Sequence, residues 1–200
     1  MPKNDYTEIV VLLDTSGSMH SIRADMCGAF NAFIADQKII PGECTVTLAT
    51  FNNDYSLAYR SKPLSEVSPL SFSPGGSTAL NDALVKTIDD AGEHLNKLAE
   101  DAKPDKVMFI VITDGEENAS KKYDVNDVKT RIEHQANVYN WAFLYFGANQ
   151  DAVLTAKGYG ISNSSDYSAD SSGVARAGTR MSDSTRSYRT TGNNKGLITP

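Results

Sequence analysis

The sequence predicts an α/β fold: a three-layer, doubly wound (Rossmann-like) domain with a mostly parallel sheet and one antiparallel edge strand. Short apolar runs rich in β-branched and aromatic residues alternate along the 200 residues with longer segments whose apolar residues recur at helical spacing. One pair of strand-like segments is joined by a short turn, whereas the other strands are separated by helical segments, which make parallel crossovers.

The first strand is predicted at residues 9–13, where five apolar residues follow one another and three of them are β-branched. Such a run suits a strand that is covered on both faces. Apolar residues at helical spacing then extend from residue 22 to residue 34, and Pro41-Gly42 ends the pattern. We therefore expect a first crossover helix directly after the first strand.

A hairpin is predicted next. Residues 45–51 and 55–60 are both β-rich, and Asn52-Asn53-Asp54 between them is turn chemistry. The second of these strands would be the antiparallel strand at one edge of the sheet.

The middle of the chain alternates regularly between helix and strand patterns. Residues 80–98 form a long amphipathic pattern, and residues 106–113 form a buried-strand run. Asp124 can cap a helix over residues 125–136, and residues 141–146 predict the next strand.

The C-terminal part predicts weaker elements: a short helix at 151–157, a brief strand at 164–169 and a closing helix at 174–188. The closing helix has poor propensity, so its stability must come from docking on the sheet. We expect one domain at residues 1–190 and a loose tail at 191–200. The arginines of this end are interpreted as a solvated helix face in salt bridges with the acidic body: Arg176, Arg180, Arg186 and Arg189.

Composition limits the possible functions. A net charge of −6 argues against non-specific nucleic-acid binding, and the longest apolar runs are far shorter than the ~20 residues that span a bilayer. The N-terminus leads within a few residues into the first strand and leaves no room for a signal peptide, so we expect a cytoplasmic protein without a membrane segment. Cys27 and Cys44 lack metal-ligand spacing and are interpreted as buried free thiols, with a disulfide as the alternative.

A cluster of oxygen-bearing side chains follows the predicted strands. Asp14, Ser16 and Ser18 come at alternate positions after the first strand, and Asp114 ends the strand at 106–113. Because the carboxyl ends of parallel strands share one edge of a sheet, these groups should lie close together. Thr78 follows a pair of glycines at the start of a helical pattern and can reach the same edge. Hard oxygen ligands of this kind suit Mg²⁺ or Mn²⁺ rather than zinc.

This order of residues resembles the metal-ion-dependent adhesion site of von Willebrand factor type A (vWA) domains. The three parts, Asp14-x-Ser16-x-Ser18, Thr78 and Asp114, occur in the family's order, and each follows the right element. The resemblance covers roughly Tyr6 to Tyr188, and no expected ligand position is substituted. It is closest to intracellular bacterial or phage-type vWA proteins, which serve as accessory modules in stress-response, tellurite-resistance or ATPase-linked assemblies.

The resemblance implies a ligand set and a function. Ser16 and Ser18 would bind Mg²⁺ directly, with Mn²⁺ or Ca²⁺ as alternative ions, and Thr78 would bind directly or through water. Asp14 and Asp114 would act largely through water or as acceptors behind the ligands. One position of the ion would stay open for a Glu or Asp carboxylate of a protein partner. The implied function is metal-dependent protein–protein interaction without catalysis, and neither the partner nor the oligomeric state follows from it.

Other interpretations remain open. Asp14 could be only a helix N-cap, Asp114-Gly115 only a turn, and residues 75–78 only a loop with a capping residue. An Asp after a hydrophobic strand also resembles aspartyl-phosphate phosphohydrolases, but Ser16 stands where those enzymes carry a general acid. A metal-dependent phosphohydrolase or phosphotransfer accessory is therefore the second hypothesis. A structural subunit that uses the fold without an ion is the third.

Further residues are placed near the same edge. Carboxylates after Asp114 can be partners of a helix dipole or line the rim, and polar residues after the strand at 141–146 are interpreted as a turn and N-cap. His20 is expected in the exposed first turn of a helix. Pro74, Gly75 and Gly76 let the segment before Thr78 hold more than one position, so it is the candidate switch. The rim residues are Glu116, Glu117, Asn149, Gln150 and Asp151.

Overall fold

The strands build one mixed sheet. The computed structural model describes residues 3–148 and 151–198, and within them six strands follow the order β3-β2-β1-β4-β5-β6. β3 is antiparallel to β2, and every other neighbouring pair is parallel. The predicted hairpin and fold class are therefore confirmed. The strands are β1 (Lys3–Asp14), β2 (Glu43–Phe51), β3 (Tyr55–Pro63), β4 (Pro104–Thr113), β5 (Ala142–Gly147) and β6 (Asn163–Asp166).

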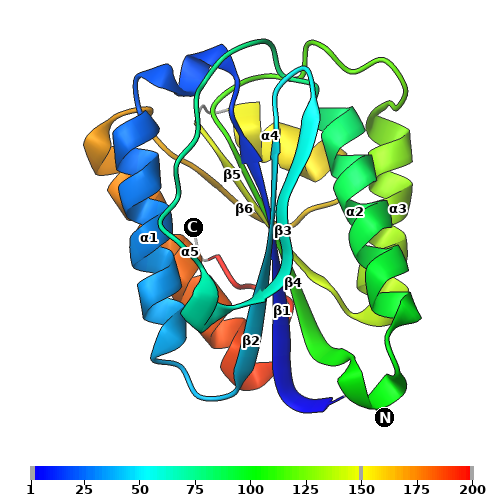
Figure 1. Ribbon diagram of the computed structural model, residues 1–200. Coiled ribbons are helices and arrows are strands. Elements are labelled where there is room, and N and C mark those ends of the chain that lie inside the picture. The colour runs from blue at the N-terminus through cyan, green and yellow to red at the C-terminus, as the bar shows by residue number, and fades with distance from the viewer. Residues whose placement is uncertain (1–2, 149–150, 199–200) are drawn as a thin grey trace.

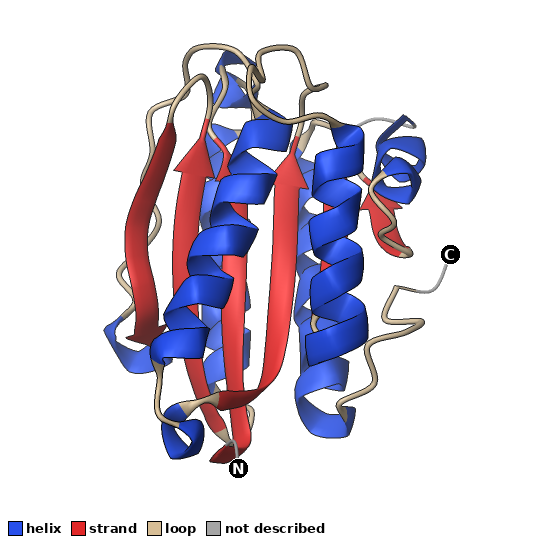
Figure 2. Ribbon diagram, turned by 90° about the vertical axis from the view of Figure 1, so that its right-hand side faces the viewer, coloured by secondary structure: helices blue, strands red, loops and turns tan. Residues whose placement is uncertain are grey.

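Helices cover both faces of the sheet (Figure 1, Figure 2). α1 and α5 lie on one face, and α2 and α3 lie on the other. In the described part of the chain, no helix combines the length and the apolar character needed to cross a membrane. The helices are η1 (Gly17–His20), α1 (Arg23–Lys38), η2 (Leu64–Glu66), α2 (Leu80–Lys97), η3 (Glu100–Ala102), α3 (Val125–Tyr139), α4 (Asp151–Gly158) and α5 (Ser171–Thr191).

The alternation of side chains along β1 divides the core into two layers. Ile9, Val11 and Leu13 pack with residues of α1 and α5, whereas Val10 and Leu12 pack with residues of α2 and α3. All five side chains have 0% exposure. β1 is therefore a central strand that is buried on both faces, and this packing fixes the position of its carboxyl end.

The helix over residues 125–136 begins where the sequence predicts. The Asp124 carboxylate accepts the backbone N–H groups of Asn126 at 2.8 Å and Asp127 at 3.0 Å, and the Asp127 side chain accepts the N–H of Asp124. This reciprocal arrangement is a capping box. It satisfies N–H groups that have no partner within the helix, and the N-cap prediction is confirmed.

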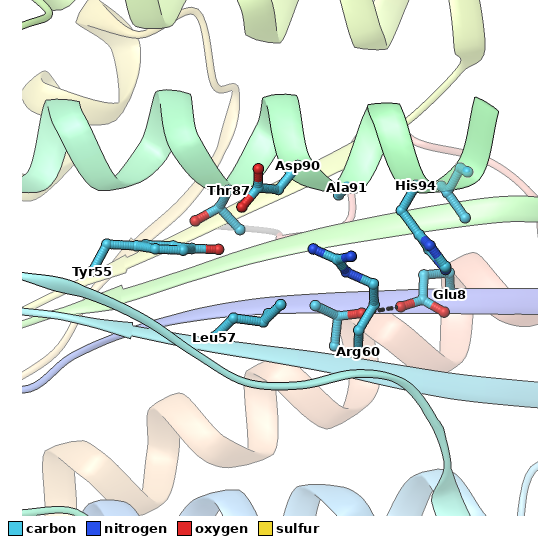
Figure 3. A pocket seen from close by; sticks show the side chains of 10 residues that line it. Glu8, Tyr55, Leu57, Arg60, Thr87, Asp90, Ala91 and His94 are labelled. Atoms are coloured by element: carbon cyan, nitrogen blue, oxygen red, sulfur yellow. Dashed lines mark hydrogen bonds between the residues drawn. The ribbon is translucent and has the colours of Figure 1, made fainter. Parts of the chain in front are cut away.

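An acidic residue in the middle of β1 is enclosed within the fold. Glu8 is 1% exposed, and its carboxylate accepts hydrogen bonds from the hydroxyls of Thr47, at 2.6 Å, and Thr45. It faces a cavity of about 10 Å³ that Arg60 and His94 also line (Figure 3). A cavity of this size holds about one water molecule. Burial raises the pKa of the Glu8 carboxyl, and the hydroxyl hydrogen bonds partly oppose that shift.

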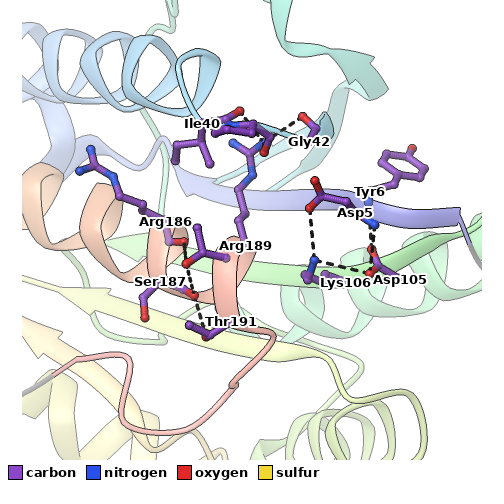
Figure 4. A network of polar contacts seen from close by, with 12 residues as sticks. Asp5, Tyr6, Ile40, Gly42, Asp105, Lys106, Arg186, Ser187, Arg189 and Thr191 are labelled. Atoms are coloured by element: carbon purple, nitrogen blue, oxygen red, sulfur yellow. Dashed lines mark hydrogen bonds and ion pairs between the residues drawn. The ribbon is translucent and has the colours of Figure 1, made fainter.

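Arg189 does not lie on the solvated helix face that was predicted for the C-terminal arginines, so the prediction is wrong for this residue. Arg189 is 3% exposed and donates to the carbonyl of Gln37 at 2.7 Å and to that of Gly42 at 3.3 Å (Figure 4). α1 ends at Lys38, and the last carbonyls of a helix lack partners within it and attract a cation. Arg189 therefore ties α5 to the end of α1.

The segment after α5 returns to the domain. The carbonyl of Leu197 accepts the Ser184 hydroxyl at 2.8 Å, and its N–H donates to Asn163 Oδ1 at 3.0 Å. Asn163 also donates to the carbonyl of Asn194 at 3.0 Å. These contacts anchor the described part of the segment to β6 and α5, and the boundary at residue 190 stays a prediction.

Candidate metal centre

The predicted site residues meet at the carboxyl edge of the sheet. β1 and β4 are parallel neighbours in which Leu13 is the register partner of Ile112, so Asp14 is level with Thr113, and Asp114 follows one residue later at the same edge. Ser16 and Ser18 belong to the turn that leads from β1 through η1, and Thr78 lies just before α2. Residues far apart in the sequence are thus brought to one edge, as expected from parallel strands.

Asp14 is the buried base of this site. It has 0% exposure, and its Oδ1 accepts the backbone N–H of Ser16 at 2.7 Å. Its Oδ2 accepts the Thr113 hydroxyl, also at 2.7 Å. Burial raises the pKa of the Asp14 carboxyl, and these hydrogen bonds oppose the shift. Thr113 was not among the site residues predicted from sequence, although its place directly before the aspartate that follows β4 was a visible signal.

A chain of hydrogen bonds links the two serines to the second aspartate. The hydroxyls of Ser16 and Ser18 lie 3.1 Å apart, and the Ser18 hydroxyl donates to Asp114 Oδ1 at 2.6 Å. Burial raises the pKa of the Asp114 carboxyl, the bond from Ser18 opposes this, and the charge of Asp14 adds to it. The two carboxylates therefore interact unfavourably when both are ionised.

Gly115 leaves open the space onto which these oxygens face. A Cβ atom at Gly115 would lie 2.9 Å from Thr78 Oγ1, 3.6 Å from Ser18 Oγ and 3.7 Å from Asp14 Oδ2. The hydroxyl of Thr78 thus shares one small region with oxygens of the other two segments. In the sequence, Gly115 was considered only in the alternative interpretation of Asp114-Gly115 as a turn, and it was not predicted that a side chain at this position would fill the site.

Glu117, one of the predicted rim residues, has a structural role. The Glu117 carboxylate accepts the N–H of Asn81 at 2.8 Å, in the first turn of α2, so its predicted role at a helix dipole is supported. It also accepts the N–H and the hydroxyl of Ser120 at 2.8 and 2.7 Å. His20 is exposed, as expected, but it is the last residue of η1 and does not lie in the first turn of α1. The predicted turn and cap at Asn149 and Gln150 lie outside the described residues.

The donor set fits a hard divalent ion. The described residues contain no group of three or more His, Cys, Asp or Glu side chains that could hold a metal ion. An ion at this edge would therefore rely on two carboxylates and on hydroxyl oxygens, which suit Mg²⁺ or Mn²⁺ and offer nothing to a metal that prefers thiolates. A divalent cation would also remove the repulsion between Asp14 and Asp114. The two cysteines are free and lie in α1 and β2, Cys44 buried and Cys27 partly buried.

Solved structures share this fold at low sequence identity. A von Willebrand factor type A protein from Catenulispora acidiphila has a TM-score of 0.57 and 14% identity over 88% of this chain and 42% of its own. A proximal thread matrix protein from the mussel byssus, with a zinc-occupied MIDAS motif, has a TM-score of 0.56 and 14% identity over 88% and 47%. The manganese-loaded TRAP protein of Plasmodium vivax has a TM-score of 0.52 and 19% identity over 78% and 64%.

These likenesses concern the fold alone, and the chain spans less than two thirds of the length of each of the three proteins. A search of curated proteins found no match to the chain. The family model of the von Willebrand factor type A domain matches residues 8–169, which include every residue of the candidate site. The chain therefore belongs to the von Willebrand factor type A domain family.

Proposed function

We propose that this domain mediates protein–protein interaction through a bound divalent ion, Mg²⁺ or alternatively Mn²⁺ or Ca²⁺. The ion would be held by Asp14, Ser16, Ser18, Thr78 and Asp114. The observation that carries the proposal is the meeting of two carboxylates with hydroxyls at an open edge: Asp14 has 0% exposure, Asp114 is half-buried and Ser18 is exposed. An ion at this place would be held on its inner side by the buried Asp14 and would be accessible to a partner on the side of the exposed Ser18.

The chemistry of the hydroxyls explains why a partner would be needed. When bound, the ion supplies a positive charge that neutral hydroxyl ligands leave largely uncompensated. A Glu or Asp carboxylate of a partner is the natural group to complete its shell, because Mg²⁺ prefers oxygen ligands and gains from an anionic one. The relatives described as manganese-loaded and zinc-occupied support metal binding by this fold.

A metal-dependent phosphohydrolase is the second candidate, and the surroundings of Asp14 argue against it. Both carboxylate oxygens accept hydrogen bonds, from the N–H of Ser16 and from the hydroxyl of Thr113. A small ion can still bind beside these oxygens, whereas a nucleophile needs an exposed oxygen that a bulky phosphate can approach, and the Asp14 side chain is fully buried. Ser16 also provides no acid to protonate a leaving group.

The first experiment tests the ion. Titration calorimetry with Mg²⁺ and Mn²⁺ should show one ion per chain for the wild type. Gly115→Ala keeps every proposed metal ligand but fills the space between the ligands, and should weaken metal binding about tenfold or more. Gly75→Ala is the control, because a Cβ there meets nothing within 4 Å. A wild type without binding at millimolar metal would refute the proposal and favour a structural role without an ion.

The second experiment tests the carboxylate of the partner. We would present the domain with a peptide array in which each peptide containing one Glu or Asp is paired with its Gln or Asn counterpart. In Mg²⁺, retention should be confined to acidic members, and chelator should abolish it. Equal retention of the amide counterparts, or retention that persists in chelator, would show that the ion does not mediate recognition. Turnover of a generic phosphate ester that Asp14→Asn abolishes would favour the enzyme instead.

A further inference from the structure

The segment that carries Thr78 is bonded to three separate parts of the fold. This segment, residues 75–79, is named the threonine loop here. Its two glycines suggest from sequence a segment that can move. Its backbone N–H and C=O groups nevertheless form hydrogen bonds with three other segments of the chain, and those segments have hydrogen bonds of their own.

The first contact is with the turn that follows β1. The N–H of Gly75 donates to the carbonyl of Thr15 at 2.9 Å, and the N–H of Gly17 donates to the carbonyl of Gly76 at 3.0 Å. Thr15 is itself fixed, because its hydroxyl donates to the carbonyl of Phe51 at 2.9 Å. The threonine loop is thus joined to the segment that carries Ser16 and Ser18.

The second contact is with the β2–β3 hairpin turn. Asn52 Nδ2 donates to the carbonyl of Gly75 at 2.8 Å, and the carbonyl of Asn52 accepts the N–H of Ala79 at 2.9 Å. Asn53 Oδ1 accepts the N–H of Ser77 at 2.8 Å. Asn52 therefore holds both ends of the loop, and Asn53 holds its middle.

The third contact involves Thr78 directly. Its N–H donates to Asn118 Oδ1 at 2.9 Å, and its carbonyl accepts the N–H groups of Asn118 at 3.0 Å and Ala119 at 3.2 Å. The Glu117 carboxylate braces this partner segment, because it also accepts the N–H of Ala119 at 3.0 Å. Both backbone groups of Thr78 are therefore committed to the segment that follows Asp114, and Thr78 itself is 3% exposed.

We propose that the threonine loop is a fixed part of the metal centre, and that Asn118 is the positioning residue that aims the Thr78 hydroxyl at it. The inference rests on the proposed function and adds its regulation: the site is preformed before an ion or a partner arrives. Displacing Thr78 would break its bonds to Asn118 and strain those to the hairpin turn, and each broken bond leaves a backbone group without its partner. Binding to a preformed site needs no rearrangement of the loop.

The first test follows the amide of Thr78 by hydrogen exchange in the full chain, with chelator and with Mg²⁺. In the wild type we expect protection in chelator that changes less than about threefold on adding Mg²⁺. Asn118→Ala should accelerate exchange at Thr78 by about tenfold or more. Asn118→Asp keeps the accepting Oδ1 and should restore protection, which a general loss of stability would not do. An unprotected Thr78 amide in the wild type, or one that Mg²⁺ protects tenfold or more, would overturn the inference.

The second test uses the adjacent glycines as a matched pair. Gly76 has a φ of +78°, and a Cβ there would collide with Asn53 Oδ1, whereas a Cβ at Gly75 meets nothing within 4 Å. Gly76→Ala should therefore shift the loop and lower Mn²⁺ affinity about 10–100-fold, with Gly75→Ala within about twofold of the wild type. Asn118→Ala should resemble Gly76→Ala. Unchanged Mn²⁺ affinity in both Gly76→Ala and Asn118→Ala would overturn the role of the loop contacts.

The two proposals fail in different ways. If the wild type binds no Mn²⁺, the proposed function fails, and exchange at Thr78 in chelator still reports whether the loop is fixed. If the wild type binds Mn²⁺ but its Thr78 amide is unprotected until the ion arrives, the loop is a switch. In that case the metal-dependent function stands and this inference is wrong.

Discussion

Glu8 and Asp14 are two carboxylates of the same strand in different surroundings. Both are almost completely buried, at 1% and 0% exposure, and both accept hydrogen bonds from threonine hydroxyls. In both, burial raises the carboxyl pKa. Neither burial nor the shifted pKa therefore distinguishes the candidate site from an internal polar group.

The difference lies in what surrounds each carboxylate. Glu8 is enclosed by β2, β3 and α2, next to a cavity of about 10 Å³ (Figure 3). Asp14 ends its strand, and a second carboxylate, Asp114, and an exposed hydroxyl, Ser18, lead from it to the surface. A buried carboxylate becomes a candidate ligand where the strand ends, because further oxygens from neighbouring loops can converge there and an ion can enter.

The largest expected effect separates the two residues by metal binding. Asp14→Ala should weaken Mg²⁺ and Mn²⁺ binding at least about a hundredfold, roughly 2.7 kcal/mol, because it removes a carboxylate that faces the proposed ion. Glu8→Gln should leave binding unchanged, since Glu8 has no path to the ion. Titration calorimetry of both variants measures this. The comparison fails if Glu8→Gln weakens binding as much as Asp14→Ala.

The second effect concerns stability, for which the substitution of Glu8 should matter more than the substitution of Asp14. Glu8→Ala should lower the free energy of unfolding by about 2 kcal/mol, because the buried hydroxyls of Thr45 and Thr47 lose their acceptor. In chelator, Asp14→Ala should cost less, because removing it relieves the repulsion of Asp114. Urea unfolding of both variants gives the comparison. A larger loss for Asp14→Ala would identify Asp14 as the structural residue.

The third effect is stabilisation by the ion. At a free Mg²⁺ concentration ten times its Kd, binding to the native state should add about 1.4 kcal/mol to the free energy of unfolding. Glu8→Gln should keep this increment, and Asp14→Ala should lose it. Thermal or urea unfolding with and without chelator measures it. An increment that survives in Asp14→Ala would place the ion elsewhere.

The smallest effect is the pH dependence that belongs to Glu8. Because its pKa is raised in the native state, the native protein holds this proton to a higher pH than the unfolded chain does. The resulting stabilisation is complete below the unfolded pKa and is lost as pH rises through the native pKa. Wild type should therefore lose stability relative to Glu8→Gln as the pH rises above the ordinary pKa of a glutamate, as measured by urea unfolding in chelator. A difference that is constant with pH would contradict the shift.

Local patterns in the sequence were enough for the elements and for the order of the candidate ligands. The apolar run before Asp14, the turn at Asn52–Asp54 and the cap at Asp124 each depend on neighbours within a few residues, and all three appear as expected. Parallel strands then require that Asp14 and Asp114 share an edge. The aspartates and serines of the candidate site could thus be brought together from strand ends alone, whereas Thr78 was predicted from the glycine pair and the helical pattern beside it.

What the sequence could not determine depends on contacts between distant residues. The hydrogen bond between Thr113 and Asp14 joins residues 99 positions apart in the sequence, and the bond between Asn118 and Thr78 joins residues 40 positions apart. The bond from Arg189 to Gln37, near the end of α1, joins residues 152 positions apart. In the sequence, Arg189 resembles any exposed arginine, and Gly115 any turn glycine. Their roles are set by which carbonyls and which oxygens lie opposite them, and the packing of strands and helices alone decides that.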